Sequence, residues 1–183
     1  MRRAAALALF LCLAAPALAT EVAGVKVPDA ATVGGVPLVL NGAGLRKRFI
    51  VKVYVGALYL AQRSRDPVAI LAADAPWKVS MFFLRDVDRG KIVGAFKEGF
   101  EKNSPAQQAQ HLADLQKFEA VLADLKEGQE LVIAYAPGQG TTLTAPGGAG
   151  VTVPGPSFGT ALLRNWLGEK PADSDLKQGM LGQ

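Results

Sequence analysis

The chain has 183 residues, half of them apolar, and its 20 basic and 16 acidic side chains give a net charge of +4. This small excess, with a single basic cluster at residues 46–48, does not fit a nucleic-acid-binding protein. The one cysteine, Cys12, lies in an N-terminal apolar run, so the rest of the chain has no thiol for a disulfide framework, a thiolate metal site or a cysteine nucleophile.

The first 19 residues predict a signal peptide. Arg2 and Arg3 form a basic start, the apolar run after them is too short to span a bilayer, and Ala17 and Ala19 form a small-x-small cleavage site. We expect cleavage after Ala19, export to the periplasm or the exterior, and one domain over residues 20–183. No later apolar run is long enough to cross a membrane.

Strand patterns dominate the first half of this domain. They predict strands over residues 21–27, 33–40, 49–60 and 77–84, and a helix over residues 67–73 that Asp66 caps. Gly42 and Gly44 predict a turn before the long strand. The odd positions of that strand form an apolar face that we expect to be core. Its other face carries Lys52 and Tyr54 among apolar residues, which fits a partly wet surface or the wall of a ligand cleft.

The second half begins with two predicted helices. Asp88 caps the first, and Ser104 opens the second, whose apolar stripe is Leu112, Leu115, Phe118, Leu122 and Leu125. We expect the two helices to form an antiparallel pair that covers one face of a sheet. Strands over residues 130–136, 141–145 and 151–153 follow, and then helices over residues 157–168 and 174–181. The order of elements predicts one α+β domain.

Several segments together resemble the chalcone isomerase superfamily, particularly its bacterial chalcone-isomerase-like branch. They are Asn41-Gly42-Ala43-Gly44-Leu45-Arg46, the strand that ends in Gly56-Ala57-Leu58-Tyr59-Leu60, and residues 82–87, 115–118 and 163–171. The resemblance covers nearly the whole predicted mature chain. It implies the chalcone isomerase fold, a large and strongly curved antiparallel sheet with a layer of helices on one face.

Arg46 is the first candidate for ligand binding. A guanidinium can offer a two-point contact to a carboxylate or phenolate, although spacing alone favours an ordinary surface arginine. The resemblance places Arg46 at the family's ligand-binding arginine, which contacts anionic groups of flavonoid or fatty-acid ligands. Tyr54 could add a phenol donor, and Asn165 and Trp166 could line the mouth of the same pocket. The commoner role of a residue such as Tyr54 is a packed sheet residue, and that of Trp166 is a core anchor.

Other positions depart from the enzymes of the superfamily. Their strand threonine falls on Tyr54, their helix tyrosine and asparagine fall near Ile92 and Gly99, and their C-terminal pocket threonine falls on Asn165. Because positioning groups contribute much of an enzyme's rate, we expect no efficient isomerase activity. The prediction is a protein that binds a small apolar anion such as a fatty acid, with no metal or cofactor. Two alternatives are a genuine intramolecular lyase that uses Arg46, Tyr54 and Asn165, and a structural or partner-binding domain without a cleft.

His111 is the sole histidine and lies at the edge of the apolar stripe of its helix. Some mitochondrial relatives with this fold resemble haem-binding proteins, so a haem role is a further alternative, but one histidine without a second ligand more often belongs to the core boundary. Serine-histidine-aspartate catalysis would also need His111, and nothing in the sequence places a serine near it.

Overall fold

The computed structural model describes residues 19–183. The strands are β1 (Ala19–Val22), β2 (Val25–Pro28), β3 (Ala30–Val33), β4 (Val36–Arg48), β5 (Val51–Leu60), β6 (Trp77–Phe83), β7 (Glu130–Ala136), β8 (Gly140–Thr144) and β9 (Gly150–Val153). The helices are α1 (Pro67–Ala72), α2 (Arg89–Asn103), α3 (Pro105–Gln108), α4 (Leu112–Val121), α5 (Pro156–Leu167) and α6 (Ser174–Met180). The predicted signal peptide lies, apart from Ala19, outside the described residues, and cleavage after Ala19 stays a prediction.

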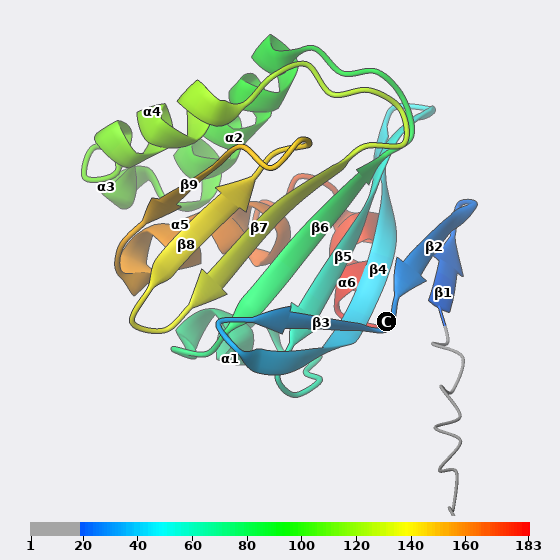
Figure 1. The fold of residues 1–183 in the computed structure, drawn as a ribbon, viewed down its shortest axis with the longest axis horizontal. Coiled ribbons are helices and arrows are strands. Elements are labelled where there is room, and N and C mark those ends of the chain that lie inside the picture. Colours follow the sequence, from blue (N-terminus) through cyan, green and yellow to red (C-terminus); the bar gives the residue numbers. More distant parts are fainter. Residues whose placement is uncertain (1–18) are drawn as a thin grey trace, which may run out of the picture.

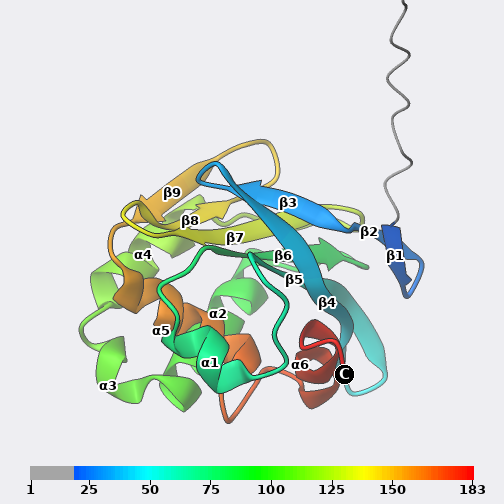
Figure 2. The same ribbon diagram turned by 90° about the horizontal axis from the view of Figure 1, so that it is seen from below.

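Seven strands form one antiparallel sheet in the order β3-β4-β5-β6-β7-β8-β9, and β1 and β2 form a separate hairpin. The sheet curls around the helices, as Figures 1 and 2 show from two directions. No helix of residues 19–183 has the length and apolar character needed to cross a membrane. The predicted α+β class, with a curved antiparallel sheet and a helical layer, is confirmed.

Both faces of the long strand β5 are buried, which the strand pattern did not predict. Tyr54 and Leu58 face the helices and belong to the large core between sheet and helices. Val55, Ala57 and Tyr59 face the other way, into a smaller core that includes residues of β2, β3 and β4. Because β3 and the β1–β2 hairpin cover the outer face of this strand, its inner face is left to contact helices and, at one end, a cavity.

The glycine-rich segment is part of a strand and not a turn. Gly42 and Gly44 lie inside β4 and have no positive φ angle. A Cβ atom on Gly44 would stand 2.8 Å from the backbone oxygen of Leu176, and one on Gly42 would clash with the oxygen of Gly179. The two glycines therefore allow α6 to pack directly on the backbone of β4, a contact with a segment more than 130 residues later that local spacing does not reveal.

The turn instead lies at Phe49 and Ile50, which the sequence pattern assigned to the strand. β4 runs on to Arg48 and β5 begins at Val51, so these two apolar residues form the hairpin turn. Phe49 adopts φ 57°, in the left-handed region. A continuous apolar run predicts a strand unless a turn signal interrupts it, and residues 49–50 lack the usual Asn-Gly or Asp-Gly signal.

The first predicted strands also divide differently. Residues 21–27 are a hairpin that turns at Ala23 and Gly24, both with positive φ, and residues 33–40 are shared between β3 and β4. The helix predicted from Ser104 is interrupted between α3 and α4, and Leu112 of its stripe is 52% exposed. The antiparallel arrangement holds, because the Arg89 guanidinium at the start of α2 donates to backbone oxygens at the end of α4.

Candidate functional site

A cavity of about 490 Å³ lies between the hairpin end of the sheet and the helices α2 and α5. This volume is in the range of small-molecule pockets, roughly 300–1,000 Å³. Most of its wall is apolar, and the lining residues are Arg46, Arg48, Phe49, Val51, Val53, Tyr54, Met81, Phe83, Arg85, Asp86, Val87, Lys91, Ile92, Ala95, Phe96, Asn165, Trp166 and Ala172. The four residues singled out in the sequence, Arg46, Tyr54, Asn165 and Trp166, all line this one cavity.

Arg46 and Tyr54 lie side by side on the cavity wall. They are paired residues of β4 and β5, and Tyr54 pairs in turn with Phe83 of β6. The Arg46 Cζ atom lies 5.8 Å from the centroid of the Tyr54 ring, within cation–π range. Its Nε atom is buried and has no hydrogen-bond partner among residues 19–183. An unused, charged donor therefore lies at the wall of an apolar cavity.

The hydroxyl group of Tyr54 is held by the helix layer. Trp166 Nε1 of α5 donates a hydrogen bond to it at 3.0 Å, and the residue is almost completely buried. Burial raises the pKa of Tyr54, and the nearby Arg46 charge and the Trp166 hydrogen bond offset this only in part. The phenol is therefore neutral at physiological pH and keeps a proton that it can donate to a bound anion.

A β-bulge decides which side chains of β5 reach the cavity. Arg46 pairs with Tyr54, but Lys47 pairs with Lys52, so one residue of β5, Val53, is extra. An extra residue moves the following side chains to the opposite face. Val51 therefore lines the cavity and Lys52 does not, which corrects the prediction that Lys52 shares a face with Tyr54.

Asn165 packs α5 against α2. Its side chain fills the space next to Gly99, where a Cβ atom would clash with it, and its Nδ2 atom donates to the Phe96 oxygen at 3.5 Å. The Oδ1 atom is buried without a partner in the described part of the chain. The neighbouring Trp166 ring meets Phe96 edge to face at a centroid distance of 6.2 Å. Both residues thus have a packing role in addition to their place on the cavity wall.

Cations outnumber acids on the wall. Of the described residues, Arg46, Arg48, Arg85 and Lys91 line the cavity, against the single acid Asp86. Asp86 accepts a hydrogen bond from Lys126 at 2.8 Å, and this bond holds the pKa of its carboxyl below the ordinary value. The cavity therefore has the potential of an anion site. Arg48, Arg85 and Lys91 were not predicted as site residues, because single cations on separate elements give no pattern in the sequence.

The chain is similar to known proteins in both sequence and fold. The model of the chalcone isomerase-like family matches residues 19–182. The chain belongs to the chalcone isomerase-like family. The crystal structure of an Arabidopsis thaliana fatty-acid binding protein matches with a TM-score of 0.65 and 16% sequence identity, over 86% of this chain and 92% of that one. This identity shows a shared fold. A search of curated proteins found no match.

The resemblance placed the enzymes' helix tyrosine and asparagine near Ile92 and Gly99. Ile92 of α2 is buried and lines the cavity with an aliphatic side chain. Gly99 does not line it, because the side chain of Asn165 occupies the space over this glycine. Neither position therefore offers a polar side chain to the cavity.

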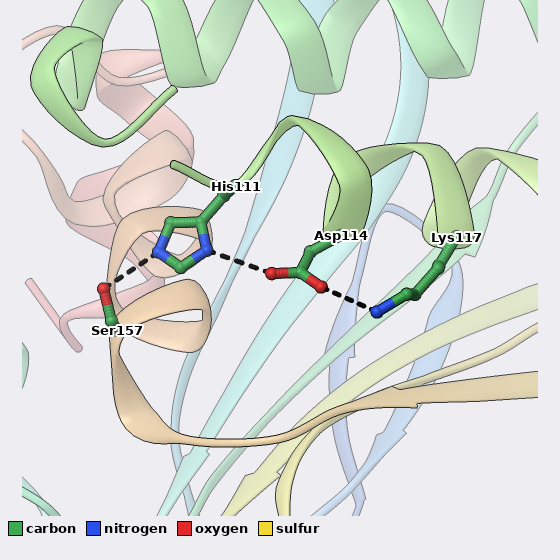
Figure 3. A network of polar contacts seen from close by, with 4 residues as sticks. All are labelled: His111, Asp114, Lys117 and Ser157. Atoms are coloured by element: carbon green, nitrogen blue, oxygen red, sulfur yellow. Dashed lines mark hydrogen bonds and ion pairs between the residues drawn. The ribbon is translucent and has the colours of Figure 1, made fainter. Parts of the chain in front are cut away.

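His111 belongs to a polar network away from the cavity (Figure 3). Its Nδ1 atom lies 3.2 Å from Asp114 Oδ2, its Nε2 atom lies 2.9 Å from Ser157 Oγ, and Lys117 donates to Asp114 at 3.0 Å. A serine does lie next to His111, which the sequence did not indicate, because Ser157 is the second residue of α5, 46 residues later.

This network links α4 to the start of α5. The His111 ring is buried and packs on Phe158 at a centroid distance of 5.5 Å. Partial burial would raise the pKa of Asp114, but hydrogen bonds from Lys117 and His111 outweigh it and keep the pKa below its ordinary value. With both ring nitrogens already in contact with protein groups, the histidine is poorly suited to ligate a haem.

Proposed function

We propose that this chalcone-isomerase-like protein binds a small apolar anion, such as a long-chain fatty acid, without efficient isomerase activity. The observation that carries the proposal is the Nε atom of Arg46, which is buried at the wall of an apolar cavity and has no hydrogen-bond partner within residues 19–183. A buried cationic donor without a partner is costly, and a ligand carboxylate would satisfy it.

The rest of the wall supports the same ligand class. Arg46 and the neutral Tyr54 phenol offer two adjacent donors for one carboxylate, and Met81, Phe83, Ile92 and Phe96 surround the space beside them with apolar surface. An alkyl chain would replace water against this surface, which is favourable by about 25 cal/mol per Å² of apolar area. The related fold of a fatty-acid binding protein adds support.

Isomerase activity has less support. A lyase would have to position its substrate and a catalytic water with Arg46, Tyr54 and Asn165 alone, since Ile92 and Gly99 supply no polar side chain. We expect chalcone cyclisation at or near the uncatalysed rate. Robust turnover that disappears in Arg46→Ala would establish the lyase instead. A purely structural domain accounts poorly for a cavity of about 490 Å³ beside Arg46.

We also propose that the protein is exported. The motif that ends at Ala19 supports cleavage before Thr20. N-terminal sequencing of the exported protein should begin at Thr20, and a sequence that begins at Met1 would refute the processing step.

Calorimetric titration tests the proposed function. Palmitate titrated into delipidated protein should bind with one site per chain, and the fatty alcohol of the same length should bind more weakly because it has no charge for Arg46. Equal affinities for the acid and the alcohol, or no heat from either, would contradict the proposal.

A further inference from the structure

The tip of the β4–β5 hairpin, residues 47–52, is the most exposed apolar feature of the described chain. Phe49 is 92% exposed and Ile50 is 94% exposed, more than any other large apolar residue between residues 19 and 183. The tip projects at the upper right of Figure 1, at the far end of the molecule from α1. Two adjacent large side chains with this exposure are costly in water, so they require an explanation.

The backbone gives no reason for the choice of phenylalanine. Phe49 has φ 57°, a conformation that glycine adopts easily and that other residues adopt under strain. Glycine would suit both this turn and its contact with water. Neither local conformation nor folding therefore accounts for Phe49, and strained residues of this kind are often retained for binding.

Cations flank the two apolar residues. Lys47, Arg48 and Lys52 are all exposed, and none of them forms an ion pair with an acid within residues 19–183. An apolar tip with a basic collar is complementary to an anionic lipid surface, where the apolar side chains enter the interface and the cations contact headgroups. A second copy of the chain would bring the same cations together, which disfavours self-association through the tip.

The tip is continuous with the ligand cavity. Arg48, Phe49 and Val51 are part of both, so a surface that contacts the tip also lies at the cavity mouth. Arg46 immediately precedes the tip on the same strand, β4. A fatty acid in a bilayer keeps its carboxylate at the level of the headgroups, where this arginine could meet it.

We infer that residues 47–52 dock the protein on an anionic lipid bilayer, with the mouth of the cavity toward the membrane. This inference rests on the proposed function and identifies the source of the ligand as the bilayer. The apolar pair supplies insertion, and the cations supply preference for anionic headgroups.

The experiment is flotation of the exported protein, with its N-terminus sequenced, on vesicles of phosphatidylcholine alone or mixed equally with phosphatidylglycerol. The N-terminus must be known because an attached apolar leader would bind bilayers by itself. We expect preference for the anionic vesicles and loss of binding at high salt. Ile50→Ser should lower the partition coefficient about tenfold, and Lys52→Gln should lower it about fivefold.

Val68→Ser is the matched control, because Val68 is 73% exposed on α1, away from the tip, and its loss should not change partitioning. Phe49→Gly should weaken vesicle binding while it raises the melting temperature, a combination that misfolding cannot produce. Equal binding to the two vesicle types, unchanged binding of Ile50→Ser, or a dimer that Ile50→Ser disrupts would overturn the inference.

The palmitate titration separates this inference from the proposed function. The side chains of Ile50 and Lys52 do not line the cavity, so both variants should bind palmitate in solution like the unaltered protein. If vesicle binding fails while palmitate binds, only the docking surface is refuted. If palmitate does not bind, the proposed function is refuted.

Discussion

Replacement of Arg46 by alanine should weaken fatty-acid binding by about 2 to 3 kcal/mol, roughly 30- to 150-fold in Kd. Truncating one partner of a buried charge pair costs about 2 to 5 kcal/mol. Arg46 is half-buried, with Nε fully buried and the rest of the residue partly in contact with water, so the lower part of that range applies.

Folding stability should respond much less to Arg46→Ala. The Nε atom has no protein partner in the described chain, so no hydrogen bond of this atom is lost on truncation. The contact with the Tyr54 ring is worth about 0.5 to 1 kcal/mol at a partly exposed site, and we expect the free energy of unfolding to change by no more than about that amount. Arg46→Ala is thus predicted to weaken ligand binding much more than it lowers the free energy of unfolding.

The assay is calorimetric titration of palmitate into four proteins, with chemical denaturation of each. Arg46→Lys should recover part of the affinity, because an ammonium keeps the charge but not the planar two-point contact. Lys47→Ala is the control: it removes a neighbouring cation that borders the adjoining, more polar pocket and does not line the apolar cavity. Equal affinities for the unaltered protein and Arg46→Ala would refute the carboxylate contact, and equal losses in Arg46→Ala and Lys47→Ala would reduce it to a general effect of charge.

Three further predictions concern the fold. Gly44→Ala should destabilise the protein by about 1 to 3 kcal/mol, because its Cβ atom would stand 2.8 Å from the backbone of α6; urea denaturation measures this, and an unchanged midpoint would contradict the close packing. Burial raises the pKa of all three tyrosines, that of Tyr135 to about 12, whereas phenols of the unfolded chain ionise near pH 10. The free energy of unfolding should therefore not depend on these phenols below about pH 10 and should fall as the pH rises above it. Phenolate absorbance should then rise together with loss of circular dichroism, and ionisation near pH 10 in a folded protein would be inconsistent with this burial. His111→Ala should lower the free energy of unfolding by about 1 to 3 kcal/mol, and Ser157→Ala, at an exposed position, by less than about 1 kcal/mol; the reverse order would argue for another role of the network.

Much of the fold could be predicted from the sequence because its signals are local. The helix after Asp66 begins as expected, with the Asp66 carboxylate accepting hydrogen bonds from the backbone nitrogens of Val68 and Ala69. The apolar faces of α2 and α5 and the alternation in β6 and β7 likewise depend on neighbours within a few residues.

Long-range contacts explain what the sequence could not show. The glycines of β4 resembled a turn because their packing partner is α6, at the other end of the chain. The turn at Phe49 resembled a strand because Phe49 and Ile50 are large apolar residues, which are common in strands and uncommon in exposed turns with a positive φ angle. The bulge at Val53, which removes Lys52 from the cavity face, depends on strand register, and a strand pattern contains no register.

The candidate site could likewise be predicted only in part. Arg46, Tyr54, Asn165 and Trp166 were named through the family resemblance, and they do meet at one cavity, although their part in ligand binding stays a prediction. Family resemblance gave positions but not partners. The Trp166 contact with the Tyr54 hydroxyl, and the lack of a partner for Arg46 Nε among residues 19–183, depend on how β4, β5 and α5 pack together.

Native mass spectrometry of the protein purified from its own host tests the central claim most directly, since it requires no choice of ligand beforehand. We predict a one-to-one adduct whose organic extract contains a long-chain carboxylic acid, and a much smaller adduct on Arg46→Ala purified in parallel. A protein that carries no small molecule in either the native spectrum or the extract, or one that carries an uncharged ligand equally in both proteins, would contradict the account.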